Sequence, residues 1–133
     1  MSTARDLVEA ALRELGELAA GEPMNADDAQ EVLTALNRMV KAWSLEGIRI
    51  EHTDLALGDT FLLPPDHEQA IITNLAERIA PLFEAQPSAI TIREARRGLR
   101  LLKTYYFNLV DVKFEPGLLD FQNNRSDYDI SQG

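Results

Sequence analysis

The first apolar stripe of the chain predicts a helix over residues 3–18. Apolar side chains recur every three or four positions from Leu7 to Leu18, which is the spacing of one helix face. Thr3 and Asp6 have the spacing of a capping box, in which each side chain binds the other residue's backbone amide. The Gly21-Glu22-Pro23 segment predicts the end of this helix.

A second stripe predicts a helix over residues 25–46. Its apolar positions lie between Val32 and Trp43. Asn25 is well suited to the N-cap position, and Gly47 stands where a glycine commonly follows the last turn. Because a short loop joins this helix to the first one, we expect the two to be antiparallel.

The next segment follows a different period. Residues 48–53 alternate between apolar and polar side chains, and Gly58 with Asp59 forms a turn signal before a second short apolar run. Alternation of this kind is typical of extended backbone. We therefore expect a short hairpin or an extended arm between Ile50 and Phe61.

Two more helices are predicted in the second half. Pro65 suits the first helical position, and apolar residues from Ile71 to Phe83 form the next stripe. Pro81 lacks an amide proton and is expected to bend the last turn. Ser88 follows a proline and opens a fourth helix. The apolar face of that helix consists of Ile92, Ala95, Leu99, Leu102 and Tyr106.

The helical period ends near Tyr106. Residues 107–133 contain turn signals and scattered acids but keep large apolar side chains, which disordered tails usually lack. This arm either packs back on its own helices or becomes ordered on another chain. Its candidate contact residues are Phe107, Phe114, Leu118, Leu119, Phe121, Tyr128 and Ile130. The predicted fold is all-α, an antiparallel bundle of four helices, with a helical domain over 1–106 and an extended C-terminal arm over 107–133.

Charge is unevenly distributed along the chain. The total of 13 basic and 22 acidic residues gives a formal net charge of −9. Residues 1–65 carry 5 basic and 12 acidic side chains, residues 66–105 carry 6 and 5, and residues 106–133 carry 2 and 5. The acidic mean argues against a general phosphate-binding surface, although the middle segment is locally basic.

Five of the basic residues form a stripe on the fourth predicted helix. At about 100° per residue they fall within one sector of about 120°, beside the apolar face. The members of this basic stripe are Arg93, Arg96, Arg97, Arg100 and Lys103. Arginine suits bidentate contacts with carboxylates or phosphates. The stripe is a solvated surface, a contact with a neighbouring subunit, or a nucleic-acid contact. Gly98 lies mid-helix and would permit a close helix crossing there.

The sequence offers little for enzymatic chemistry. The chain has no cysteine, which excludes disulfides, thiolate nucleophiles and cysteine-based zinc sites. His52 and His67 are its only imidazoles and lack a metal-binding helical spacing. No phosphate loop or nucleophile elbow is present, and no carboxylate pair stands out. We expect no catalytic residue, no cofactor and no metal, and no membrane partner, because no apolar run approaches the roughly 20 residues that span a bilayer.

Several stretches, in this order, resemble a known family. They are residues 3–16, 20–23, 26–29, 36–39, the Trp43-Ser44-x-Glu46-Gly47 helix end, the Leu63-Pro64-Pro65 segment with the residues through 71, and residues 74–81. The pattern is similar to head-to-tail adaptor proteins of tailed bacteriophages, and especially to the tail accessory factors, or packaged-DNA stabilisation proteins, of short-tailed phages. The resemblance covers about residues 3–105. Relatives carry a longer insertion between Ile50 and Phe61, and the segment after Tyr106 has no counterpart that we can match.

The resemblance implies a structural role in a virion. It implies a helical protomer that forms a ring, typically a dodecamer, below the portal protein at the head–tail junction, after assembly in the host cytoplasm. The ring would extend the DNA channel, retain packaged DNA without sequence-specific contacts and provide the attachment surface for tail or nozzle proteins. The acidic first half and the basic stripe would suit a contact between neighbouring copies.

Two other functions remain open from the sequence. A DNA-binding module could use the basic stripe of the fourth predicted helix. A tail-associated hydrolase is the third possibility, although no acid–base pair supports it.

Overall fold

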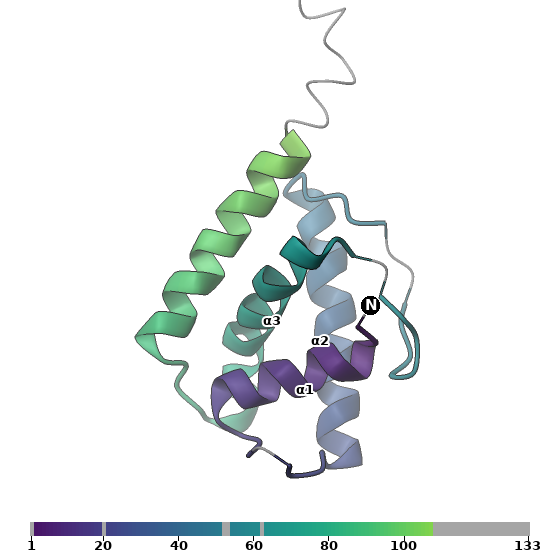
Figure 1. Ribbon diagram of the computed structural model, residues 1–133, viewed down its shortest axis with the longest axis vertical. Helices are drawn as coiled ribbons and strands as arrows, with labels where there is room; N and C mark the ends of the chain where they lie inside the picture. Colours follow the sequence, from purple (N-terminus) through teal and green to yellow (C-terminus); the bar gives the residue numbers. More distant parts are fainter. Residues whose placement is uncertain (1, 20, 52–53, 62, 108–133) are drawn as a thin grey trace, which may run out of the picture.

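The computed structural model describes residues 2–19, 21–51, 54–61 and 63–107 (Figure 1). These residues form α1 (Ala4–Leu15), α2 (Ala26–Leu45), α3 (Pro65–Ile79), the 3-10 turn η1 (Ala80–Phe83) and a fourth α-helix over residues 89–107. The predicted all-α class is confirmed. No helix in the described ranges is both long and apolar enough to cross a membrane. The arm after residue 107 lies outside the described residues.

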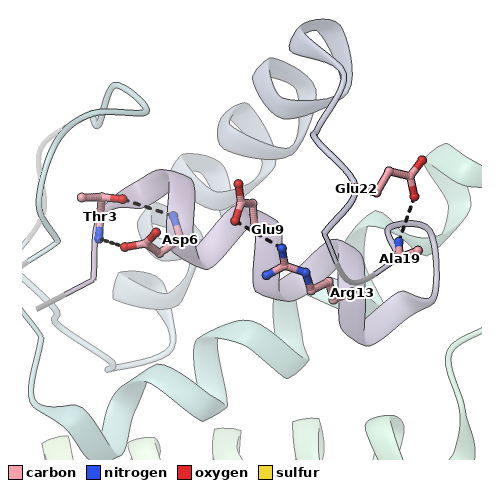
Figure 2. A network of polar contacts seen from close by, with 6 residues as sticks. All are labelled: Thr3, Asp6, Glu9, Arg13, Ala19 and Glu22. Carbon is pink, nitrogen blue, oxygen red and sulfur yellow. Dashed lines mark hydrogen bonds and ion pairs between the residues drawn. The ribbon is translucent and has the colours of Figure 1, made fainter.

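Capping chemistry fixes the start of α1. The Asp6 amide donates to Oγ1 of Thr3 over 3.2 Å, and the Thr3 amide donates to Oδ2 of Asp6 over 3.0 Å (Figure 2). The predicted capping box is thus confirmed. The helix ends at Leu15, however, because Gly16 adopts a left-handed conformation with φ of 85°. The predicted continuation to Leu18 is wrong, although the Leu18 side chain is buried.

Both predicted ends of α2 are confirmed. Oδ1 of Asn25 accepts the Asp27 amide over 2.8 Å. At the other end, Gly47 has a φ of 89°, and the Ile48 amide donates to the carbonyl of Trp43 over 3.0 Å. A left-handed glycine of this kind lets the chain turn back and satisfy the last helical carbonyls.

The segment between α2 and α3 forms no strand within its described residues. Instead, its backbone pairs with the N-terminus: the Ala4 amide donates to the Asp59 carbonyl over 2.9 Å, and the Arg5 amide donates to the Leu57 carbonyl over 3.0 Å. These bonds satisfy two amides that have no partner inside α1. The described part of this segment therefore has the start of α1 as a backbone partner, and the choice between a hairpin and an extended arm stays a prediction.

Three helices alternate in direction and one lies across them. In Figure 1, α2, α3 and the 89–107 helix run up, down and up, whereas α1 crosses α2 and α3 at a steep angle. This arrangement departs from the antiparallel pairing expected for the first two helices. The ten residues between α1 and α2 are enough for the chain to change direction before α2 begins.

The core lies where α1 packs on α3 and on α2. Its fully buried side chains come from all three helices and from Ile48, three residues after the end of α2. They include Leu7, Val8, Val32, Leu36, Met39, Ile48, Ile71, Leu75 and Ile79. Burying each such aliphatic side chain contributes roughly 1.5–3 kcal/mol.

The bend predicted at Pro81 is confirmed by η1, which follows α3 directly. Leu82 was expected on the apolar stripe, but its side chain is 55% exposed. The tighter winding of a 3-10 turn, with 3.0 residues per turn, shifts this position away from the core.

Candidate interaction surface on the 89–107 helix

Polar bonds at its N-terminus position the 89–107 helix. The Thr91 amide donates to Oγ of Ser88 over 3.1 Å, and the Ile92 amide donates to the Ser88 carbonyl over 3.0 Å. Ser88 is therefore the N-cap. The Thr91 hydroxyl also donates to Oε1 of Glu14 in α1 over 2.9 Å, which joins the start of this helix to the end of α1.

A close crossing holds the middle of the helix against α3. A Cβ atom built on Gly98 would lie 2.7 Å from Cβ and 2.9 Å from Cα of Ala70, so only glycine fits without a shift. Near this crossing, Nδ2 of Asn74 donates to the carbonyls of Ala70 and Ala95, over 2.7 and 2.9 Å. The close crossing that the sequence suggested at Gly98 is confirmed.

The last turn of the helix meets the first turn of α3. Nε2 of His67 lies 3.2 Å from the hydroxyl oxygen of Tyr106, and Nδ1 lies 3.3 Å from Oδ1 of Asp66. The rings of His67, Tyr105 and Tyr106 contact one another edge to face, with centroids 4.9–5.6 Å apart. Burial, with smaller effects of Tyr105 and Asp66, raises the pKa of the Tyr106 hydroxyl.

A chain of carboxylate, imidazole and hydroxyl can serve proton transfer in principle. Here the His67 side chain is only 2% exposed, and both of its ring nitrogens have a partner. A phenol with the ordinary pKa of 10.0 is already protonated near neutral pH, and burial raises the pKa of Tyr106 further. The arrangement is therefore suited to joining two helices rather than to attack on a substrate.

The basic stripe lies on the outer side of this helix. All five of its side chains are exposed, and Nζ of Lys103 lies 3.5 Å from Oε1 of Glu46. Within the part of the chain that the structure describes, the other four have no ion pair. We call Arg93, Arg96, Arg97 and Arg100 the arginine face. Four exposed guanidinium groups on one helix can bind carboxylates or phosphates in bidentate fashion.

A shallow groove runs beside the arginine face, between this helix and α3. It encloses about 320 Å³, and its walls include Arg97, Leu101 and Tyr105 from the helix and Gln69 from α3. Leu101 is 59% exposed. The groove thus places an apolar side chain next to a guanidinium group, a combination common at protein contacts.

Few of the other candidate residues predicted from the sequence lie within the described part of the chain. Phe107 ends the described helix and is 63% exposed. The other six candidate contact residues of the arm, and His52, lie outside the described residues. Among the residues described, no group of three or more histidine, aspartate or glutamate side chains could hold a metal ion.

The contact between His67 and Tyr106 was missed in the sequence. The two residues are 39 positions apart, and no local motif links them. The only available signal was that each stands on the apolar side of its predicted helix, close to the end where an antiparallel pair would meet.

No protein-family model matches this chain, and a comparison with curated proteins also finds no match.

Proposed function

We propose that this chain is a structural head-to-tail adaptor of a phage virion. It assembles as a ring below the portal protein, extends the DNA channel, retains packaged DNA and offers the attachment surface for tail proteins. The C-terminal arm over 107–133 binds the portal or a neighbouring copy. The proposal draws on the ordered resemblance over residues 3–105 and includes assembly in the host cytoplasm.

The arginine face is the structural observation that carries this proposal. Its four side chains are exposed and have no ion pair among the described residues. Because these side chains are exposed, their guanidinium groups can reach carboxylates or phosphates of another molecule. Four exposed cations without an ion pair among the described residues suit a protein whose work is to contact other macromolecules.

Electron microscopy of the purified chain mixed with its portal protein tests the proposal. We expect a closed ring of this protein on the portal. The portal alone is the control, because any extra ring density must come from the added chain. Absence of such a ring at saturating concentration would reject the adaptor function.

DNA binding through the arginine face is a second candidate, favoured by the same four exposed guanidinium groups, which have no ion pair within the described ranges. It predicts that the isolated chain binds duplex DNA with an affinity that falls steeply with salt, because phosphate contacts release counterions. The variant Arg97→Gln with Arg100→Gln would then lose DNA binding. Salt-independent or undetectable binding of the wild-type chain would exclude this candidate.

A further inference from the structure

The chain carries a second set of charges, of opposite sign to the arginine face, that likewise form no ion pair among the residues the structure describes. Residues 14–37 contain six acidic side chains and no basic one. They lie on the end of α1, the first turns of α2 and the loop between them, at the lower edge of Figure 1. We call this set the acidic end. Its members are Glu14, Glu17, Glu22, Asp27, Asp28 and Glu31.

The acidic end has no cation of its own within the described residues. The Glu14 carboxylate accepts the Thr91 hydroxyl, and the Glu22 carboxylate accepts the Ala19 amide (Figure 2). The nearest basic residue in the sequence, Arg13, lies 3.6 Å from Glu9 instead. None of the six carboxylates takes part in an ion pair there.

The fold keeps the acidic end away from the arginine face of the same molecule. The acidic end touches the 89–107 helix through Thr91. At 3.6 residues per turn, Thr91 projects from the helix about 180° from the centre of the arginine face. Among the described residues, no ion pair joins the two charged surfaces within one chain.

We infer that the arginine face binds the acidic end of a second copy of this chain. This inference rests on the proposed ring and names the contact that builds it. Four guanidinium groups along about 10 Å of helix (seven steps of about 1.5 Å) meet six carboxylates. Leu101, exposed beside Arg97, adds apolar area to the contact.

A contact between two different surfaces propagates from copy to copy. Each molecule keeps one free arginine face and one free acidic end, so the assembly continues until it closes into a ring or grows as a filament. Single exposed ion pairs contribute little, but a set of complementary charges speeds association and fixes the register of the partners. The contact should weaken strongly in salt, because screening lengths shrink from about 10 Å at 0.1 M to about 3 Å at 1 M.

Analytical ultracentrifugation of the full chain, without portal or DNA, tests the inference. Wild type should self-associate at low salt and dissociate at high salt. Arg97→Gln with Arg100→Gln, and separately Glu17→Gln with Glu31→Gln, should each weaken self-association by about tenfold or more. As a matched control, Arg5→Gln with Arg49→Gln removes two exposed charges elsewhere and should change nothing.

Mixing the two weakened variants gives the sharpest result. Each variant keeps one intact surface, so an equimolar mixture should form a heterodimer and nothing larger. A mixture that behaves like its separate components overturns the inference, as does a wild type that stays monomeric at low salt and high concentration. The inference is also overturned if Arg97→Gln with Arg100→Gln loses DNA binding but self-associates as wild type does, because the arginine face would then bind nucleic acid and not a second copy.

The two proposals can fail separately. If the mixture forms its heterodimer but wild type builds no ring on the portal, the adaptor function fails and the contact between copies stands. If wild type builds the ring and both charge variants do so equally well, the adaptor function stands and this contact is rejected.

Discussion

The inner and outer faces of the 89–107 helix are held by different chemistry. On the inner face, Gly98 allows close contact with Ala70, Asn74 bonds the Ala95 carbonyl, and Leu102 enters the core. On the outer face, four arginines project without an ion pair to any described residue. The inner face therefore determines the fold of this region, whereas the outer face is free to determine what the molecule binds.

Replacing each of two neighbouring leucines with alanine should give the largest difference in stability between the inner and outer faces. Leu102 is 3% exposed and Leu101 is 59% exposed. We expect Leu102→Ala to lower the free energy of unfolding by about 2–5 kcal/mol, because it leaves a cavity in the core. Leu101→Ala should change it by no more than about 0.5 kcal/mol. Urea denaturation of both variants measures the difference, and equal effects would show that the two faces are not distinct.

Adding a single methyl group at the crossing of the 89–107 helix and α3 should have the next largest effect on the free energy of unfolding. Gly98→Ala gains about 1 kcal/mol of helix propensity, yet its Cβ would lie 2.7 Å from Cβ of Ala70. We expect a net destabilisation of about 1–3 kcal/mol from overpacking. Thermal unfolding of Gly98→Ala, with and without Ala70→Gly, tests the cause. The second change should restore part of the loss, and a Gly98→Ala variant more stable than wild type would contradict the close crossing.

The partly buried hydroxyl of Tyr106 predicts a loss of stability at alkaline pH. Its pKa is raised above the ordinary value of 10.0, so the folded state favours the neutral phenol. The resulting stability is complete below pH 10 and is lost as pH rises through the folded-state pKa. Tyr106→Phe should remove this part of the alkaline decline and cost about 1 kcal/mol at neutral pH from the lost hydrogen bond.

The matched variant for this titration is Tyr105→Phe, which removes the neighbouring phenol. Denaturant unfolding should be measured between about pH 8 and about pH 11.5, a range that spans the ordinary tyrosine pKa. The free energy of unfolding should fall with rising pH in Tyr105→Phe and fall less in Tyr106→Phe. An equal decline in both variants would assign the alkaline sensitivity to another group.

The smallest effect on stability is expected at the arginine face. Arg97→Gln with Arg100→Gln removes two exposed charges that have no ion pair among the described residues. We expect a change of no more than about 0.5 kcal/mol in unfolding free energy, although the same variant should be deficient in association. A large destabilisation would mean that the outer face also supports the fold.

Local chemistry was readable from the sequence where it acts over a few residues. The caps at Thr3, Asn25 and Ser88 each place a hydrogen-bonding side chain next to an amide two or three positions away. The apolar stripe of the fourth helix also predicted its inner face, because helical periodicity determines which side chains share a side. Gly98 stood out for the same reason, as a glycine costs stability inside a helix unless something requires it.

Contacts between distant parts of the chain were not readable in the same way. Nothing near Gly16 in sequence indicated that the chain would turn there rather than at Gly21, since both glycines can adopt positive φ. The alternation after α2 predicted extended backbone but not its partner, which is the N-terminus. The crossing of α1 over α2 and α3 depends on how three apolar faces fit together. The sequence of any one of these helices does not determine that fit.

The backbone bonds at the start of α1 also constrain the order of events during synthesis. The amides of Ala4 and Arg5 leave the ribosome early, but their acceptors, the carbonyls of Asp59 and Leu57, are made more than 50 residues later. The first turn of α1 can therefore form these two native hydrogen bonds only after the segment that follows α2 has been made. Hydrogen exchange at these two amides would report the closure of this long loop, even though they belong to α1, which is made before the segment that carries their acceptors.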